Sequence, residues 1–289
     1  MGRSGRARRL GLLLAVGLFA AAVPRSAAEP ASLQLRQETL AAFDLYVRLT
    51  EARVDDELRR GNRFLWVDGL PDAKRQAAYA ELRQGQVWIE RLETRQDGQP
   101  IKCPHGLIHH WLGVVFIPGA TLEQTLRLVE DYDHHAVYYK PDVMRSKILE
   151  RHGDDFKVSL RFYRKKILTV VLDTEHEIHY FPVDATHAHS RSYSTRVAEV
   201  ENHGKPDERQ KPGGNDGGYL WRINTYWRFV ERDAGTYVQC ESVSLTRDIP
   251  TGLGWLLSGF VTSLPRESLT FSLTATRNAL LRKPAASQP

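Results

Sequence analysis

The chain of 289 residues has few cysteines and none of the short motifs that mark common enzymes. Its two cysteines are Cys103 and Cys240, and it lacks a G-x-S-x-G nucleophile elbow, a phosphate-binding P-loop and a Gly-rich dinucleotide fingerprint. Its 11 histidines follow no ligand framework such as H-E-x-x-H. We therefore expect no metal and no cofactor, and the sequence names no catalytic residue.

Outside its first 28 residues, the chain also lacks a surplus of positive charge. It contains 40 Lys+Arg and 35 Asp+Glu, but residues 1–28 hold five of the arginines and no acid, which leaves 35 against 35. Phosphate binding requires a positive surplus, so we expect no nucleic-acid partner.

A long apolar run lies only near the N-terminus. Four arginines precede the apolar segment 10–23, which is too short for a spanning helix, and residues 26–28 (Ser-Ala-Ala) are typical of a signal-peptide cleavage site. This pattern predicts a signal peptide over residues 1–28 and a mature chain that is periplasmic or secreted. The pair Arg8-Arg9 leaves a twin-arginine route open. No cysteine follows the run, so we do not expect a bacterial lipid anchor.

The next segment, residues 29–102, favours helices. Apolar residues on one face of an expected helix over residues 32–60 are Leu40, Phe43, Val47, Val54 and Leu58. Pro71–Arg83 predicts a second helix, and Gln86–Thr94 a strand. With few large apolar side chains this segment makes a thin core, so we interpret it as an extension that packs on the main domain rather than as an independent domain.

From about residue 103 the pattern changes to strands. A strand over His105–Ile117 is followed by a helix over Leu122–Asp131, capped by Thr121, and by an irregular helical stretch to Tyr139. The six strands expected next are Val143–Arg151, Phe156–Lys166, Ile167–Phe181, His187–Val200, Tyr219–Glu231 and Thr236–Arg247. The polar segment Asn202–Gly218 predicts a long loop.

The last long segment, Ile249–Lys283, predicts helix. Leu269, Leu273, Thr276 and Leu280 share one helical face, and we expect a second helix to begin near Pro265. An amphipathic helix that follows a run of antiparallel strands buries its apolar stripe on the face of the sheet. Residues 284–289 are expected to be a disordered tail.

This order of elements resembles that of the START-like, helix-grip (SRPBCC) superfamily. The resemblance covers roughly residues 103–282 and includes the segments GYLWRINTYWRF, CESVSLTRDIPTGLGWL and SLPRESLTFSLTATRNAL, which look like an exported bacterial branch. The superfamily includes lipid-transfer START domains, polyketide cyclases and coenzyme Q-binding proteins. The resemblance implies an α+β fold in which a curved antiparallel sheet wraps around the C-terminal helix, with a cavity for an apolar small molecule between them.

The resemblance also implies that the strand after Cys103 pairs antiparallel with the last strand. Cys103 then lies near the far end of that strand from Cys240, well beyond the ~7 Å that a disulfide tolerates between Cα atoms. We therefore do not expect a bridge, although an exported chain would permit one.

Strand alternation predicts which side chains line the cavity. The candidates on the strands are Trp221, Ile223, Thr225, Trp227, Phe229, Phe156, Val158, Leu160 and Phe162, and those on the helix are Leu269 and Leu273. In the register that we favour, Gly235 ends a three-residue hairpin loop and Trp227 pairs with Glu241. Gln239, Glu241 and Val243 then face the cavity, and Arg247 lies at its end beside Trp221. A slip of one residue would turn them outward and bring Cys240 and Ser242 inward.

Glu241 has two interpretations, because a lone buried carboxylate is too costly to be left unpaired. It is either a polar anchor for a ligand or the partner of an arginine, with Arg247, Arg266 and Arg277 as candidates. Trp255, Leu256 and Phe260 are either core residues or a lid at the cavity mouth that touches a membrane transiently.

These observations predict an exported START-like protein that binds a lipid, a quinone or a polyketide-like molecule. Two alternatives stay open. One is a cyclase- or aromatase-type enzyme that uses Glu241, Tyr219 or Arg247 as acid or base. The other is an envelope interaction module that presents Leu40, Phe43 and Val47 to a partner.

Overall fold

The computed structural model describes residues 35–61, 63–165, 169–212, 216–248 and 254–282, with side chains in the last range from residue 263 onward. These residues fall within one compact unit, Leu33–Pro289. The predicted signal peptide and C-terminal tail lie outside the described residues. Within the described ranges, no helix has both the length and the hydropathy to cross a bilayer.

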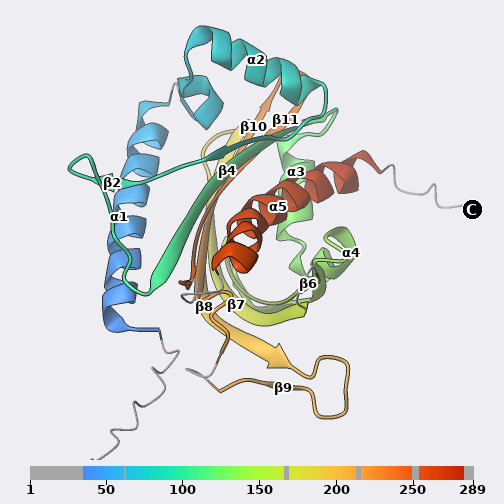
Figure 1. Ribbon diagram of the computed structural model, residues 1–289. Coiled ribbons are helices and arrows are strands. Elements are labelled where there is room, and N and C mark those ends of the chain that lie inside the picture. The colour runs from blue at the N-terminus through green and yellow to red at the C-terminus, as the bar shows by residue number, and fades with distance from the viewer. Residues whose placement is uncertain (1–34, 62, 166–168, 213–215, 249–253, 283–289) are drawn as a thin grey trace, which may run out of the picture. The chain divides into compact units, whose positions relative to one another are not determined.

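One large antiparallel sheet organises the fold (Figure 1). Its main path runs β1-β4-β11-β10-β8-β7-β6-β5. The strands of this path are β1 Trp88–Arg91, β4 Gly106–Pro118, β5 Val143–His152, β6 Asp155–Lys165, β7 Thr169–Pro182, β8 His187–Glu201, β10 Arg222–Arg232 and β11 Gly235–Arg247. Outside this path, β9 (Arg209–Gln210) pairs with β8, and β2 (Arg95–Gln96) pairs with β3 (Gln99–Pro100).

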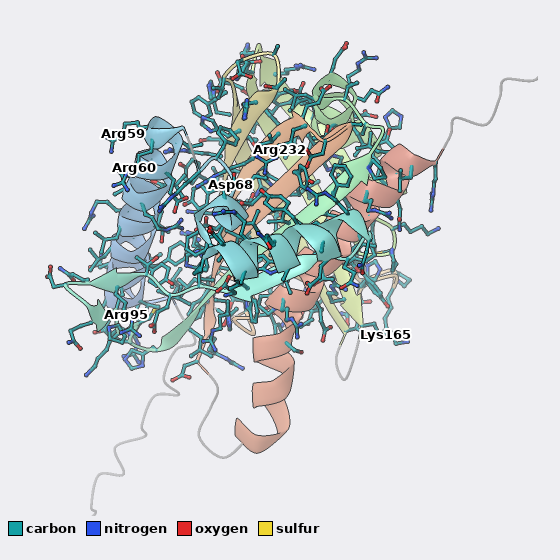
Figure 2. The ribbon with its side chains drawn as sticks, turned by 90° about the horizontal axis from the view of Figure 1, so that it is seen from above. Arg59, Arg60, Asp68, Arg95, Lys165 and Arg232 are labelled. Carbon is teal, nitrogen blue, oxygen red and sulfur yellow. The ribbon has the colours of Figure 1, made fainter. Side chains whose placement is uncertain are left out.

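Helices cover both faces of the sheet (Figures 1 and 2). On the face that we call inner lie α3 Leu122–Glu130, η2 Tyr132–His134, α4 His135–Tyr138 and α5 Gly254–Leu281. On the opposite, outer face lie α1 Gln37–Arg60, η1 Trp66–Gly69 and α2 Asp72–Arg83. The chain therefore has the START-like helix-grip fold, in which an antiparallel sheet curves around the C-terminal helix.

The N-terminal segment contributes to the sheet itself. Its strand β1 pairs with β4, with Trp88 opposite Val114. The buried side of α1 is formed by Thr39, Phe43, Tyr46, Thr50 and Val54. Phe43 and Val54 of the expected stripe are therefore buried, whereas Leu40, Val47 and Leu58 are only partly buried.

The helix α3 begins as the sequence predicts. The Thr121 hydroxyl accepts a hydrogen bond from the Gln124 backbone N–H at 3.2 Å, and the Gln124 side chain returns one to the Thr121 N–H at 3.1 Å. This capping box satisfies two of the otherwise unpaired donors at the helix start.

The C-terminal helix differs from the expectation of a second helix at Pro265. α5 continues through that residue from Gly254 to Leu281. It is held against β4 by close packing: a Cβ on Gly113 would lie 2.6 Å from the Leu273 side chain. Leu269 is buried and Leu273 is fully buried. Contact with the sheet along the apolar stripe therefore keeps the helix in one piece despite the backbone hydrogen bond that proline removes.

The register of the β10–β11 hairpin is the alternative one, and the favoured register was wrong. Arg232 pairs with Gly235, Trp227 with Cys240 and Thr225 with Ser242. The loop has two residues, and both Asp233 and Ala234 have positive φ angles, of 56° and 55°. Gly235 is needed for close packing instead, since a Cβ there would lie 2.5 Å from the Ile117 carbonyl oxygen.

Candidate functional site

A cavity of about 350 Å³ lies between the inner face of the sheet and α5. This volume falls within the range of small-molecule sites in proteins. Its wall comes from β6, β7, β8, β10 and β11, and its other sides from α3, α4, α5 and the segment before β10. The cavity lies where the resemblance predicts it, and its lining decides which ligands fit.

The structure divides the predicted cavity residues into three groups. Those that line the cavity are Leu160, Phe162, Ile223, Thr225, Trp227, Arg247 and Leu269. Phe156, Val158, Phe229 and Leu273 belong to the inner core and are packed rather than open to the cavity. Trp221, Gln239, Glu241 and Val243 were predicted wrongly, because they lie on the outer side of the sheet. The role of the lining residues in ligand binding stays a prediction.

The residues that replace the misplaced ones come from the other side of β11. Cys240, Ser242, Ser244 and Thr246 line the cavity. The one-residue slip of the hairpin was the signal that could have found them, because side chains alternate between the two faces of a strand.

A second set of lining residues gave no clear signal in the sequence. These are aromatic and histidine side chains of η2, of α4 and the residue after it, and of β7, namely Tyr132, His135, Tyr139, His176 and Tyr180. The short helices and β7 are separated in the sequence, so their side chains come together only in the folded chain.

The tyrosines and histidines in the wall are held by one another and by the backbone. The Tyr132 and Tyr180 hydroxyls lie 2.8 Å apart, and the Tyr139 hydroxyl lies 3.0 Å from that of Thr276. Burial raises the pKa of Tyr139 to about 12 and lowers the pKa of His135 and His176 to about 4. At neutral pH this part of the wall is therefore uncharged.

One ion pair lines the cavity beside α5. Asp142 pairs with Arg164, whose guanidinium also donates to the Ser268 hydroxyl at 2.9 Å and lies over the Phe271 ring. Burial raises the pKa of Asp142, and the charge of Arg164 opposes this rise. The pair places a fixed polar group at one point of a largely apolar wall.

The candidate lid residues Trp255, Leu256 and Phe260 fall in the first turns of α5. Their side chains lie outside the described residues. Leu264 and Pro265, which follow directly, line the cavity.

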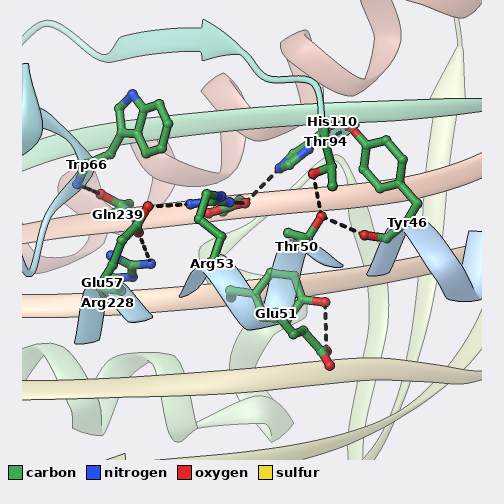
Figure 3. A network of polar contacts seen from close by, with 12 residues as sticks. Tyr46, Thr50, Glu51, Arg53, Glu57, Trp66, Thr94, His110, Arg228 and Gln239 are labelled. Atoms are coloured by element: carbon green, nitrogen blue, oxygen red, sulfur yellow. Dashed lines mark hydrogen bonds and ion pairs between the residues drawn. The ribbon is translucent and has the colours of Figure 1, made fainter. Parts of the chain in front are cut away.

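The outer face carries a buried cluster of charged side chains under α1 (Figure 3). Glu241 is fully buried, and its Oε1 accepts hydrogen bonds from the Arg53 guanidinium and, at 2.7 Å, from His110 Nε2. The predicted partners Arg247, Arg266 and Arg277 were wrong. Burial pushes the pKa of Glu241 upward, but the His110 hydrogen bond and the Arg53 charge more than offset it, so this pKa is lowered. Glu241 therefore joins α1 to the sheet instead of facing a ligand.

Hydrogen bonds extend this cluster along α1. The Tyr46 hydroxyl accepts from the Thr94 N–H at 2.8 Å and lies 2.9 Å from His110 Nδ1, so it can donate there while His110 Nε2–H donates to Glu241. Arg228, which is 1% exposed, donates to Glu57 at 2.7 Å and to the Phe64 carbonyl at 2.9 Å. The extension is thus fixed by charges whose partners lie far away in the sequence.

At the end of the sheet, η1 is fastened in the same way. Arg232 of β10 donates to Asp68 of η1 at 2.9 Å (Figure 2). The Tyr79 hydroxyl of α2 donates to the same carboxylate at 2.5 Å. Among the described residues no group of three or more His, Cys, Asp or Glu is arranged to hold a metal ion.

Both cysteines are free in the structure. Cys240 lies opposite Gly113 of β4, well along that strand from Cys103. The first long strand does pair antiparallel with the last, as the resemblance implied.

Comparison with known proteins finds likeness of structure at low sequence identity. No protein-family model and no curated protein matches the sequence. A STAR-related lipid transfer protein from Xanthomonas axonopodis is 18% identical with a TM-score of 0.43, over 67% of this chain and 93% of the other. The Zhui aromatase/cyclase from a Streptomyces species is 12% identical with a TM-score of 0.43, over 63% of this chain and 100% of the other. Human STARD10 is 11% identical with a TM-score of 0.42, over 74% of this chain and 82% of the other.

Proposed function

We propose that this chain is an exported START-like protein that binds an apolar or amphipathic small molecule in the cavity between the sheet and α5. The observation that carries the proposal is the cavity of about 350 Å³, whose wall combines apolar side chains with the ion pair of Asp142 and Arg164. Burial of a ligand's apolar surface would supply affinity at ~25 cal/mol per Å². Asp142 and Arg164 would fix the orientation of its polar end. Export is proposed from the N-terminal pattern of the sequence.

The arrangement of polar groups supports binding over catalysis. Glu241, the first candidate for an acid or base, lies on the outer face and cannot reach the cavity. The cavity tyrosines Tyr132, Tyr139 and Tyr180 are paired with hydroxyl or carbonyl groups of the protein. Tyr219 and Arg247 line the cavity and keep the cyclase-type alternative open. The interaction module loses its expected surface, because Phe43 is buried on the sheet and Val47 packs beside it.

Native mass spectrometry tests the proposal directly. The full-length chain would be expressed in a bacterial host and purified without detergent, and organic extraction would identify what it releases. We expect near-stoichiometric retention of a lipid, quinone or other apolar compound. The mass of the purified chain also tests export, since removal of residues 1–28 leaves Glu29 as the first residue.

A cavity-filling variant provides the matched comparison. Ser242→Phe places a large side chain into the cavity, whereas Ser159→Phe places the same side chain on the outer face of β6. The first should abolish retention and the second should preserve it. An empty wild-type protein that also takes up no apolar fluorescent probe would overturn the proposal.

A further inference from the structure

The sheet wall of the cavity carries hydroxyl groups where apolar side chains would bury more surface. Ser192 of β8, Thr225 of β10 and Ser242 of β11 are direct cross-strand neighbours, and all three line the cavity. Ser190 and Ser244 lie beside this row on β8 and β11 and also line the cavity.

Most of these hydroxyls lack a protein partner. Within the described part of the chain, Ser190, Ser192, Ser242 and Ser244 form no side-chain hydrogen bond, and Thr225 only accepts one, from the Trp227 indole at 3.3 Å. Ser192 of the row is 8% exposed, and Ser190 and Ser244 beside it are 2% and 4% exposed, whereas Thr225 and Ser242 are partly buried. Buried hydroxyls usually find a partner, because leaving them unpaired costs free energy. A bound molecule with oxygen atoms on its edge would supply those partners.

The spacing of the row limits what that molecule is. Adjacent strands lie about 4.8 Å apart, which is also the approximate separation of two oxygens in meta positions on a six-membered ring. Ortho oxygens are too close to meet hydroxyls on two neighbouring strands. A single-headed lipid would place one polar end here and leave the rest of the row unpaired.

We propose that the row Ser192–Thr225–Ser242 is a hydrogen-bonding subsite for a flat ring compound that carries neutral oxygens in meta positions. This inference rests on the proposed function, since it names the ligand class of the same cavity. The hydroxyls both donate and accept, so the subsite accepts phenolic or carbonyl oxygens. Two histidines that line the same cavity, His135 and His176, carry no charge at neutral pH and do not select for an anion.

Isothermal titration calorimetry with three naphthalenes of nearly equal ring size tests the subsite. The probes are naphthalene, 2,3-dihydroxynaphthalene and 1,3-dihydroxynaphthalene. We expect the full chain to bind the 1,3 isomer roughly five- to ten-fold more tightly than the 2,3 isomer, which is the effect of about one additional hydrogen bond.

The variant S192A/S242A isolates the row. It should bind naphthalene as the wild type does and lose the preference for the 1,3 isomer. The control variant S159A/T195V removes two hydroxyls of the same sheet from positions that do not line the cavity, and it should keep the preference.

The outcomes separate this inference from the proposed function. Equal binding of the two dihydroxynaphthalenes by the wild type, or an undiminished preference in S192A/S242A, would overturn the subsite and leave the apolar cavity standing. Failure of the wild type to bind any of the three probes would overturn both.

Discussion

Strands β10 and β11 present two faces, and the side chains on these two faces differ in charge. On the inner face, Thr225, Trp227 and Ser242 border open space, and the polar groups there are mostly neutral. On the outer face, Arg228 and Glu241 are buried under α1 in ion pairs with Glu57 and Arg53.

This difference shows what each face can tolerate. A buried charge is stable only where its partners are fixed, and α1 supplies them permanently from the same chain. Under the proposed function the cavity accepts and releases a ligand, so most of its wall consists of apolar groups and hydroxyls, and the charged Asp142 and Arg164 that line it pair with each other. The outer face therefore fixes the sheet, and the inner face is left free to bind.

The largest effect should come from breaking the outer cluster. Glu241→Ala leaves Arg53 and His110 without their buried acceptor and should lower the free energy of unfolding by about 3–5 kcal/mol. Urea denaturation followed by circular dichroism measures this loss. Glu177→Ala, on an exposed site of β7, is the control and should stay within about 0.5 kcal/mol of the wild type. A Glu241 variant as stable as this control would show that the cluster does not hold α1.

The next largest loss of stability is expected in the packed part of the inner face. Leu273→Ala removes a fully buried side chain that fills the space over Gly113 and should cost about 2–5 kcal/mol. Leu160→Ala should cost less, because Leu160 already borders the cavity. Equal losses in urea denaturation would contradict the division of the inner face into packed and open parts. Leu281→Ala, at an exposed position, is the control.

A pH titration of stability should separate His176 of the inner face from Glu241 of the outer face. Burial lowers the pKa of His176 from 6.5 to about 4, so in this range the unfolded chain binds a proton that the folded chain does not. The stability contributed by a neutral His176 is complete above pH 6.5 and is lost as the pH falls from 6.5 toward 4, up to about 3 kcal/mol. His176→Gln should flatten this part of the curve.

Glu241 of the outer face should respond at lower pH. The pKa of Glu241 lies below its ordinary 4.5, so its stabilising charge is present above pH 4.5 and is lost only as the pH falls further. His109, His135 and His189, whose pKa values are also about 4, add to the loss between pH 6.5 and 4 in the wild type and in the variant alike. If His176→Gln leaves the pH dependence of stability above pH 4.5 unchanged, His176 does not contribute to the loss of stability between pH 6.5 and 4.

The smallest effect is expected at the charged pair of the cavity. Arg164→Met removes the partner of a partly solvated Asp142 and should change the free energy of unfolding by about 1 kcal/mol or less. The same variant should change ligand retention in native mass spectrometry more than it changes stability. A stability loss as large as that of Glu241→Ala would show that this pair is structural.

Much of the fold was predictable because local patterns agree with it. The alternation of apolar residues gave the strands β4 to β8, and the turn residues gave their ends within a few positions. The Thr121 cap was predicted at the residue where it forms. β2, β3 and β9 were missed, because two-residue strands leave no periodic pattern.

The candidate site was predictable on β6, β10 and α5 and misassigned on β11. Leu160, Ile223 and Trp227 were placed in the lining by strand alternation, and Leu269 by its position on the apolar face of the last helix. The error on β11 arose at one turn, where Gly235 was expected to end a three-residue loop but instead pairs with Arg232, so that only Asp233 and Ala234 form the loop. Because side chains alternate with a period of two, that single shift moved every residue of the strand to the other face.

The sequence by itself determined the order of elements, the N-terminal export pattern and the amphipathic face of the last helix, since each depends on residues close together in the chain. It also determined that no surplus of positive charge lies beyond residue 28, since this depends on composition alone. Only the tertiary structure decided the hairpin register, the partners of Glu241 and the hydroxyl row of the cavity. The contact of Gly235 with Ile117, the ion pair of Arg53 with Glu241 and the alignment of Ser192 with Ser242 all join residues that the sequence separates widely. Such contacts depend on how strands and helices pack in space, which no local pattern records.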